Sequence, residues 1–137
     1  MKNLGRALEA RRVEGAVVAG AKIFADAATS KAGGVSRRIA SDIAVSSLSS
    51  GGKASVGVGL KGATSWFWHF VEFGTSSHQV EVSSRKVLAG GGEVYGVRAF
   101  PRGVRARPIF RPAYDATKTA VIRKIADESR ILLREAV

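Results

Sequence analysis

The chain has 137 residues, 45% of them hydrophobic and 24% charged, a balance that is typical of a folded domain and excludes a disordered segment. It has no cysteine, which excludes a disulfide framework and a thiolate metal site, and no apolar run approaches the roughly 20 residues of a membrane span. The formal net charge of +11 is spread along the chain, which favours a general surface property over a dedicated sequence-reading face. We expect one soluble domain over residues 1–137, without a signal peptide.

The first expected element is a helix over residues 4–28, because apolar and small residues recur there at steps of three and four. This spacing places on one face, expected to be buried, the residues Val13, Val17, Gly20, Phe24 and Ala27. The pair Gly33-Gly34 is typical of the end of a helix.

Two β-strands are expected next, over residues 42–48 and 53–60. In the second strand apolar residues alternate with Lys, Ser and Gly, a period of two that is typical of a half-buried strand. Residues 49–52, Ser-Ser-Gly-Gly, have the composition of a turn, so the strands are predicted to form a hairpin. Gly57 and Gly59 leave one face almost without side chains, which indicates solvent exposure or the close approach of another backbone.

Residues 66–75 gather five of the chain's ten aromatic residues around one carboxylate, that of Glu72. The aromatic residues are Trp66, Phe67, Trp68, Phe70 and Phe73. Trp and Phe dominate both protein cores and protein interfaces, so the segment is predicted to be a core strand or an interface anchor. Glu72 must be paired or hydrogen-bonded if it is buried.

The rest of the chain is expected to form a hairpin and a helix. Two β-rich runs within residues 79–100 are separated by Ala-Gly-Gly-Gly, which predicts a long hairpin that projects from the core. A helix is predicted from Pro112 onward, because proline is favoured in the first turn of a helix. Its expected buried face consists of Val121, Ile122, Ile125, Leu132 and Leu133. The order of elements predicts an α+β fold: an N-terminal helix, an antiparallel sheet with a long projecting hairpin, and a C-terminal amphipathic helix.

No motif in the sequence favours an enzyme. Residues 57–62 match the G-x-G-x-x-G pattern of dinucleotide sites, but the string follows a hairpin strand and does not open a helix. His69 and His78 flank Glu72 without the spacing of a zinc motif. The eleven carboxylates are scattered, and no serine lies in a nucleophile elbow. We expect no catalytic activity, no cofactor and no metal.

Two strings in the second half of the chain form a recognisable pair. F-V-E-F-G-T at residues 70–75 and A-R-P-I-F-R-P-A at residues 106–113, followed by the last helix, resemble the signature of the head–tail joining, or tail-completion, family of long-tailed bacteriophages. The resemblance covers residues 66–137 well and the first helix and hairpin loosely. It implies a non-enzymatic structural protein of the virion neck, similar to a tail terminator, that is assembled in the host cytoplasm.

The resemblance also implies a set of partners. The protein is expected to form a homo-oligomeric ring, a hexamer, at the junction of the tail tube and the head connector. It is expected to contact neighbouring neck and tail-tube proteins and to let DNA pass without sequence preference. No membrane and no small-molecule substrate is expected.

The two strings supply the residues expected to form a structural motif or an interface. These are Trp66, Trp68, Phe70, Glu72, Phe73, Gly74, Thr75, Arg107, Pro108, Phe110, Arg111 and Pro112. Glu72 is expected to pair with Arg107 or Arg111, because a lone buried carboxylate is costly. The prolines next to these arginines would hold them in place.

Residues 76–111 contain seven Lys or Arg and two acidic residues, which predicts a basic lumen in such a ring. The cations expected to face DNA are Arg85, Lys86, Arg98, Arg102 and Arg105. Two other functions stay open: a basic DNA-binding protein without sequence preference and, less favoured, a small nucleotide-binding enzyme. A monomer or dimer whose DNA affinity falls steeply with salt would favour the DNA-binding protein over the ring.

Overall fold

The computed structural model describes the backbone of residues 2–50, 53–81, 88–90, 93–96, 98–99 and 102–135, and side-chain burial within residues 11–50, 53–79, 81 and 102–135. Contacts divide the chain into two compact units. The helical unit comprises residues 1–68 and 109–137, and the central unit comprises residues 69–108. Each is compact by itself, and the single domain expected from the sequence stays a prediction.

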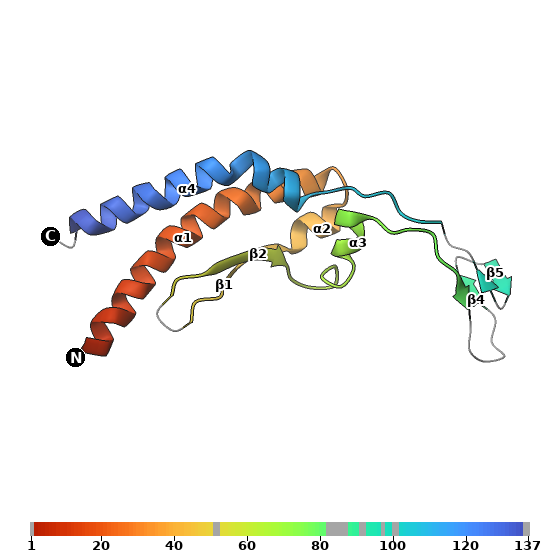
Figure 1. Cartoon of the computed structure of the whole chain (residues 1–137), viewed down its shortest axis with the longest axis horizontal. Helices are drawn as coiled ribbons and strands as arrows, with labels where there is room; N and C mark the ends of the chain where they lie inside the picture. Colours follow the sequence, from red (N-terminus) through yellow and green to blue (C-terminus); the bar gives the residue numbers. More distant parts are fainter. Residues whose placement is uncertain are drawn as a thin grey trace. The chain divides into compact units, whose positions relative to one another are not determined.

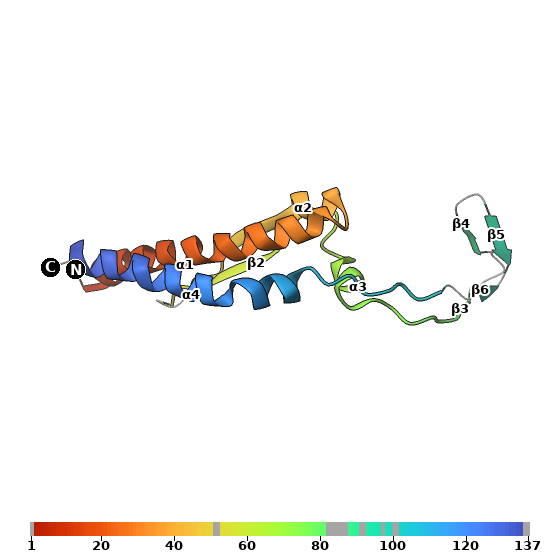
Figure 2. The same ribbon diagram turned by 90° about the horizontal axis from the view of Figure 1, so that it is seen from above.

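Two long helices, α1 (Lys2–Gly33) and α4 (Phe110–Glu135), run side by side in the helical unit (Figures 1 and 2). The buried face of α1 is made of alanines: Ala16, Ala21, Ala25, Ala28 and Ala32. Gly20 is also buried, and a Cβ atom placed there would lie 2.6 Å from Cγ1 of Ile125 on α4. Small side chains at the contact let the two helix axes approach closely.

The predicted first helix is confirmed, but its buried face is not the expected one. The helix ends at Gly33, the first residue of the predicted glycine pair. Val13 is 48% exposed, so its predicted burial is wrong, and Val17 and Phe24 are only half-buried. The physical reason is that close helix packing places alanine and glycine at the contact and leaves the larger side chains beside it.

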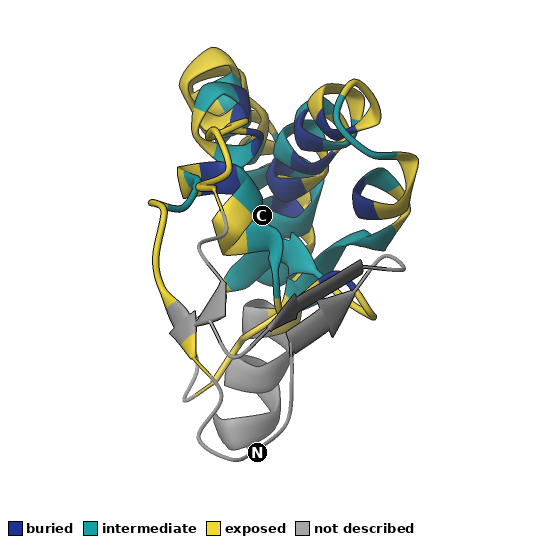
Figure 3. Ribbon diagram, turned by 90° about the vertical axis from the view of Figure 1, so that its right-hand side faces the viewer, coloured by how far each residue is buried: buried dark blue, intermediate teal, exposed yellow. Residues whose placement is uncertain are grey.

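The C-terminal helix is also confirmed, and it begins two residues before Pro112. Its expected apolar stripe is only partly covered. Ile122 is 67% exposed and Leu133 is 68% exposed, so their predicted burial is wrong. Half-buried members of the stripe are Val121, Ile125 and Leu132. In Figure 3, dark blue, which marks buried residues, covers only parts of the described helix ribbons.

One ion pair on α4 joins residues four apart. Nζ of Lys124 lies 2.6 Å from Oε1 of Glu128, and this hydrogen bond raises the pKa of Lys124 above its ordinary value. The lysine is solvent-exposed, so the pair is a minor support for the helix.

A short helix that the sequence did not predict, α2 (Arg37–Asp42), follows α1. Ser36 caps it, because its Oγ accepts a hydrogen bond from the backbone N–H of Ile39 at 3.5 Å. Ile39 is only 2% exposed and fixes this turn to the core of the helical unit.

The predicted first hairpin is confirmed. β1 (Ile43–Ser47) and β2 (Val56–Leu60) pair antiparallel, with Val45 opposite Val58. The hairpin packs against α1, and both long helices lie on the same side of it (Figures 1 and 2). These elements form a layer of helices over a sheet of two strands.

The aromatic segment forms a helix, so the prediction of a core strand is wrong. α3 (Trp68–Phe73) is a single short helix that follows a series of turns. It exposes 42% of Phe70 and 73% of Phe73 to solvent. Burial in this segment has the spacing of a helix, because Trp68 and Val71 are half-buried and Glu72 is buried, three and four positions after Trp68.

The central unit contains two nested antiparallel pairs. β3 (Val80–Glu81) pairs with β6 (Arg98–Ala99), and β4 (Leu88–Gly90) pairs with β5 (Glu93–Gly96). These pairs agree with the antiparallel hairpin predicted within residues 79–100, whose projection from the core stays a prediction. Helices together with antiparallel strands confirm the predicted α+β class.

Candidate functional site

In the central unit, the first string of the sequence motif lies beside the start of the second string and the residues just before it. The backbone N–H of Arg107 donates to the carbonyl of Val71 at 2.7 Å, and that of Thr75 donates to the carbonyl of Val104 at 2.9 Å. Oγ1 of Thr75 accepts a third hydrogen bond from the N–H of Val104 at 3.0 Å. The tertiary structure therefore brings together residues 71–75 and 104–107, which are about thirty positions apart, through main-chain bonds.

Two glycines make this close pairing possible. Gly74 has a φ of +72°, in the left-handed region, and a Cβ atom on it would lie 2.6 Å from the carbonyl oxygen of Val104. A Cβ atom on Gly103 would overlap the carbonyl oxygen of Thr75. The glycine of the E-F-G-T string is thus required by its backbone conformation and by the proximity of the arginine segment. We call this arrangement of residues 71–75 and 103–107 the paired-motif site.

Glu72 is buried, with 6% of its surface exposed, and it is the one carboxylate among the buried residues of the described part. A buried carboxylate is stable only when charge or hydrogen bonds compensate it. The sequence predicted that Glu72 needs a charged or hydrogen-bonding partner if it is buried, and it is buried. The pairing with an arginine stays a prediction.

The aromatic residues of the motif divide into two groups. Trp68 packs edge-to-face on Phe110 with ring centroids 5.4 Å apart, and Phe110 packs on Phe24 at 6.2 Å. These rings tie the start of α4 to α1 within the helical unit. Trp66 belongs to the second group, since 69% of its surface is exposed, as does Phe73 of α3. Exposed aromatic side chains are typical of interface anchors. The interface role of this segment therefore stays a prediction.

The start of α4 contains a core residue that the sequence analysis missed. Ile109 is 2% exposed, and its carbonyl accepts a hydrogen bond from the N–H of Ala113, itself completely buried, at 3.2 Å. Phe110, which the motif emphasised, is only half-buried. The pair Ile109-Phe110 in the second string indicated that an apolar residue is buried there. The order of the two residues does not reveal which of them faces the core.

A second missed contact fixes the loop before the aromatic segment. Oδ2 of Asp42 accepts hydrogen bonds from Oγ1 of Thr64 at 2.6 Å and from its N–H at 3.2 Å. Thr64 is completely buried, and Gly62, at a φ of +102°, lets the loop turn beside the carboxylate. The glycine that ends the G-x-G-x-x-G string therefore serves a turn, and Gly57 and Gly59 lie inside β2, so the string does not open a helix.

Arginines recur along the second segment of the paired-motif site, residues 103–107, and just before it. Arg102, Arg105 and Arg107 are all exposed, and residues 102–108 contain no acidic side chain. Arg111 is exposed at the first turn of α4. Arg98 lies in β6, where the side chain is not described, and Arg85 and Lys86 lie outside the described residues. Two of the cations predicted to face DNA, Arg102 and Arg105, are thus presented to solvent by this segment of main chain.

The described residues contain no group of three or more His, Cys, Asp or Glu side chains arranged to hold a metal ion. In the same part of the chain, no helix is long and apolar enough to cross a bilayer. The ring of the exposed His69 lies tilted against that of Phe70, with centroids 3.9 Å apart, and Nδ1 of His78, in the tautomer that carries a proton there, donates to the carbonyl of Ser76 at 3.3 Å.

Comparison with models of protein families places the chain near a group of bacteriophage proteins. Residues 1–74 match the sequence model of the HK97-gp10-like family, whose description is "Bacteriophage HK97-gp10, putative tail-component". The match includes α1, the hairpin and α3, and it ends inside the E-F-G-T string, whereas the resemblance seen in the sequence was strongest over residues 66–137. No curated protein and no solved structure matches the chain.

Proposed function

Because the chain belongs to the HK97-gp10-like family of bacteriophage tail components, we propose that it is a structural subunit of the phage neck that assembles into a ring of six copies around the path of the DNA. As a tail component it is part of the virion, and a structural role is typical of its family. The neck position, the ring and the passage of DNA are our proposal. The proposal joins the family match over the first half of the chain to the paired strings in the second half.

The paired-motif site is the observation that supports this function best. Main-chain hydrogen bonds and two glycines hold residues 103–107 against residues 71–75, so the exposed arginines are presented by an ordered segment rather than by a free loop. Positive charge repeated around a ring adds up to a strong field inside it, which suits a polyanion in transit.

The physics of passage limits how tight the DNA contacts can be. Any packaged sequence must pass, so contacts to phosphates are useful and contacts to base edges are not. Contacts that bind strongly would also slow the passage. We therefore expect weak phosphate contacts from Arg102 and Arg105, repeated around the ring, with an affinity that collapses between low and physiological salt.

The ring is tested with the full-length protein by electron microscopy and native mass measurement. Rings form in the absence of ligand if the proposal is correct. Labelled antibody on purified virions then places the protein at the neck, and labelling elsewhere on the particle would overturn the neck assignment. A protein that stays monomeric and binds DNA would favour the alternative of a basic DNA-binding protein.

The DNA contacts are tested with two double variants of equal charge. In the first, Arg102 and Arg105 become serine. In the matched control, two exposed cations of α1 become serine: Arg11 and Arg12. For the first variant the slope of log affinity against log salt should become shallower by about 0.9 for each phosphate that the protein no longer neutralises, and the control should keep the wild-type slope. Equal slopes in both variants would remove the arginine segment from the DNA path.

A further inference from the structure

The sheet of the helical unit is too narrow for the helices that lie over it. Strands are spaced about 4.8 Å apart, whereas packed helices lie about 8–10 Å apart, so two strands cover the width of roughly one helix. α1 packs on the hairpin and takes up that width. α4 is left with apolar side chains in solvent on the same side: Tyr114 is 57% exposed and Ile122 is 67% exposed.

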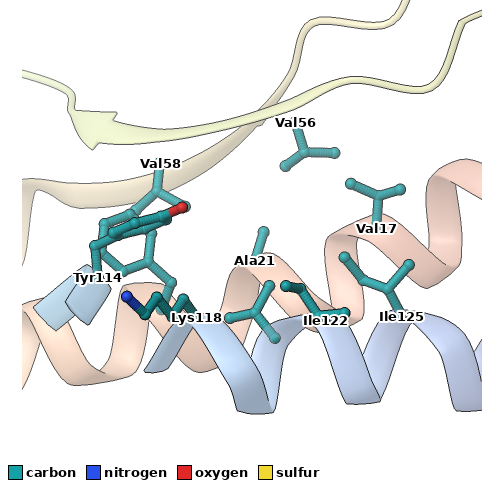
Figure 4. A pocket seen from close by; sticks show the side chains of 10 residues that line it. Val17, Ala21, Val56, Val58, Tyr114, Lys118, Ile122 and Ile125 are labelled. Atoms are coloured by element: carbon teal, nitrogen blue, oxygen red, sulfur yellow. The ribbon is translucent and has the colours of Figure 1, made fainter. Parts of the chain in front are cut away.

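An apolar groove lies where the sheet does not cover the side chains of α4. It has a volume of about 300 Å³ and is lined by α1, α4 and β2 (Figure 4). The side chains that matter here are Val17 and Phe24 of α1, Val56 and Val58 of β2, and Tyr114 and Ile122 of α4. Among the described residues that line the groove, Lys118 is the one charged side chain, and β1 contributes none. The groove therefore adjoins the side of β2 that faces away from β1.

Hydrogen bonds at the two ends of the hairpin show which backbone groups face that side. The N–H of Lys61 donates to the carbonyl of Asp42, and the N–H of Leu48 donates to that of Ser55, both at 2.8 Å. Bonded and non-bonded pairs alternate in an antiparallel ladder, so the bonded pairs between these ends involve Gly57 and Gly59.

It follows that Val56, Val58 and Leu60 direct their N–H and C=O groups away from β1. In the part of the chain that the structure describes, no strand pairs with this edge. Natural sheets usually protect such an edge with a charge, a proline or a bulge. The residues of β2, Val-Gly-Val-Gly-Leu, include neither charge nor proline, and their register with β1 is regular.

We propose that an extended segment of a second copy of this chain pairs with the free edge of β2 and inserts alternate side chains into the groove beneath α4. This inference rests on the proposed ring. An extended backbone is the one partner that satisfies a row of free N–H and C=O groups, and its period of two places every second side chain over the groove.

The net charge of each segment indicates which part of the second copy binds at the free edge of β2. Two chains of net charge +11 repel each other, and the groove itself presents Lys118. Residues 79–96 contain Glu81 and Glu93 against Arg85 and Lys86, so this stretch adds no net charge. It also contains the strands β3, β4 and β5. The strand that docks is therefore assigned to β5 (Glu93–Gly96) of the neighbouring copy, a described strand of this stretch with one carboxylate and no cation.

The test uses two single variants of the full-length protein on the same helix. Ile122→Lys places a charge in the groove, and Leu133→Lys places the same charge on an equally exposed residue outside it. Both residues are exposed, so both variants should fold with the wild-type circular dichroism and melting temperature. In sedimentation equilibrium, Ile122→Lys should weaken self-association at least tenfold, and Leu133→Lys should leave it within twofold of the wild type.

Hydrogen exchange at residue resolution distinguishes strand pairing from simple apolar contact. On assembly, the amides of Val58 and Leu60 should become protected, whereas those of Gly57 and Gly59, already bonded to β1, should not change. The proposal is overturned if Ile122→Lys assembles as the control does, or if assembled wild type leaves Val58 and Leu60 unprotected. A wild type that is monomeric at every concentration also overturns it. The neck assignment is decided separately, by the position of the protein on virions.

Discussion

The helical unit and the central unit of this protein are each stabilised internally by a different kind of contact. In the helical unit, the size of the side chains decides the packing: alanines and Gly20 let α4 approach α1, and a series of rings connects Trp68, Phe110 and Phe24. In the central unit, main-chain geometry decides: hydrogen bonds between residues 71–75 and 104–107 need Gly74 and Gly103 beside them. Substitutions should therefore act through volume in the first unit and through backbone conformation in the second.

The largest effect is expected at Glu72 of the central unit. If it pairs with Arg107, Glu72→Ala should lower stability by about 3–5 kcal/mol, the range for breaking a buried ion pair. Hydrogen exchange of the Thr75 and Arg107 amides measures this destabilisation. The double variant with Arg107→Ala should be less destabilised than the sum of the two single variants. Strictly additive effects would show that Glu72 has another partner.

Gly74→Ala tests the role of backbone conformation. A left-handed φ and a Cβ atom close to the Val104 carbonyl should together cost roughly 2–4 kcal/mol. The amides of Thr75 and Val104 should become unprotected from exchange, while the circular dichroism of the long helices stays unchanged. Helices that melt with the paired-motif site would contradict the separation between the two units.

Gly20→Ala tests the role of volume in the helical unit. The added methyl meets Ile125 and should destabilise the helix pair by about 1–3 kcal/mol, as overpacking does. Gly15 on the same helix is the matched control, because a Cβ atom there has no neighbour within 4 Å. Gly15→Ala should raise the helical melting temperature, with a gain of about 0.5–1 kcal/mol from helix propensity. Equal effects at both glycines would show that α4 does not approach α1 closely at Gly20.

The smallest effect is expected at Thr64, where a side-chain hydrogen bond supports a loop. Thr64→Val keeps the shape but removes the hydroxyl that donates to Asp42, and this should cost about 0.5–1.5 kcal/mol, because the N–H of Thr64 still donates to the same carboxylate. Thr64→Ser keeps the hydroxyl and should recover most of that stability. Urea unfolding followed by the fluorescence of Trp66 and Trp68 measures both variants. No difference between valine and serine would remove the hydrogen bond as the cause.

The amino-acid sequence by itself determined the element types with strong local signals. The period of the first and last helices, Pro112, the glycine pair after α1 and the alternation in β2 are properties of neighbouring residues, and each predicted its element correctly. The pairing of E-F-G-T with A-R-P-I-F-R-P-A was also visible as a resemblance. The positive φ of Gly74 in the first string, and its close neighbour Val104, were not predicted.

The tertiary structure alone decided which faces are buried and which segments meet. Periodicity marks the apolar side of α1, but the close approach of α4 gives the buried positions to alanines and exposes Val13. Local composition made Trp68 to Phe73 a candidate strand, whereas the structure folds them into a helix. The contact of Asp42 with Thr64, and that of Gly74 with Val104, join residues 22 to 30 positions apart. Such contacts depend on where the chain turns between them, which no local pattern encodes.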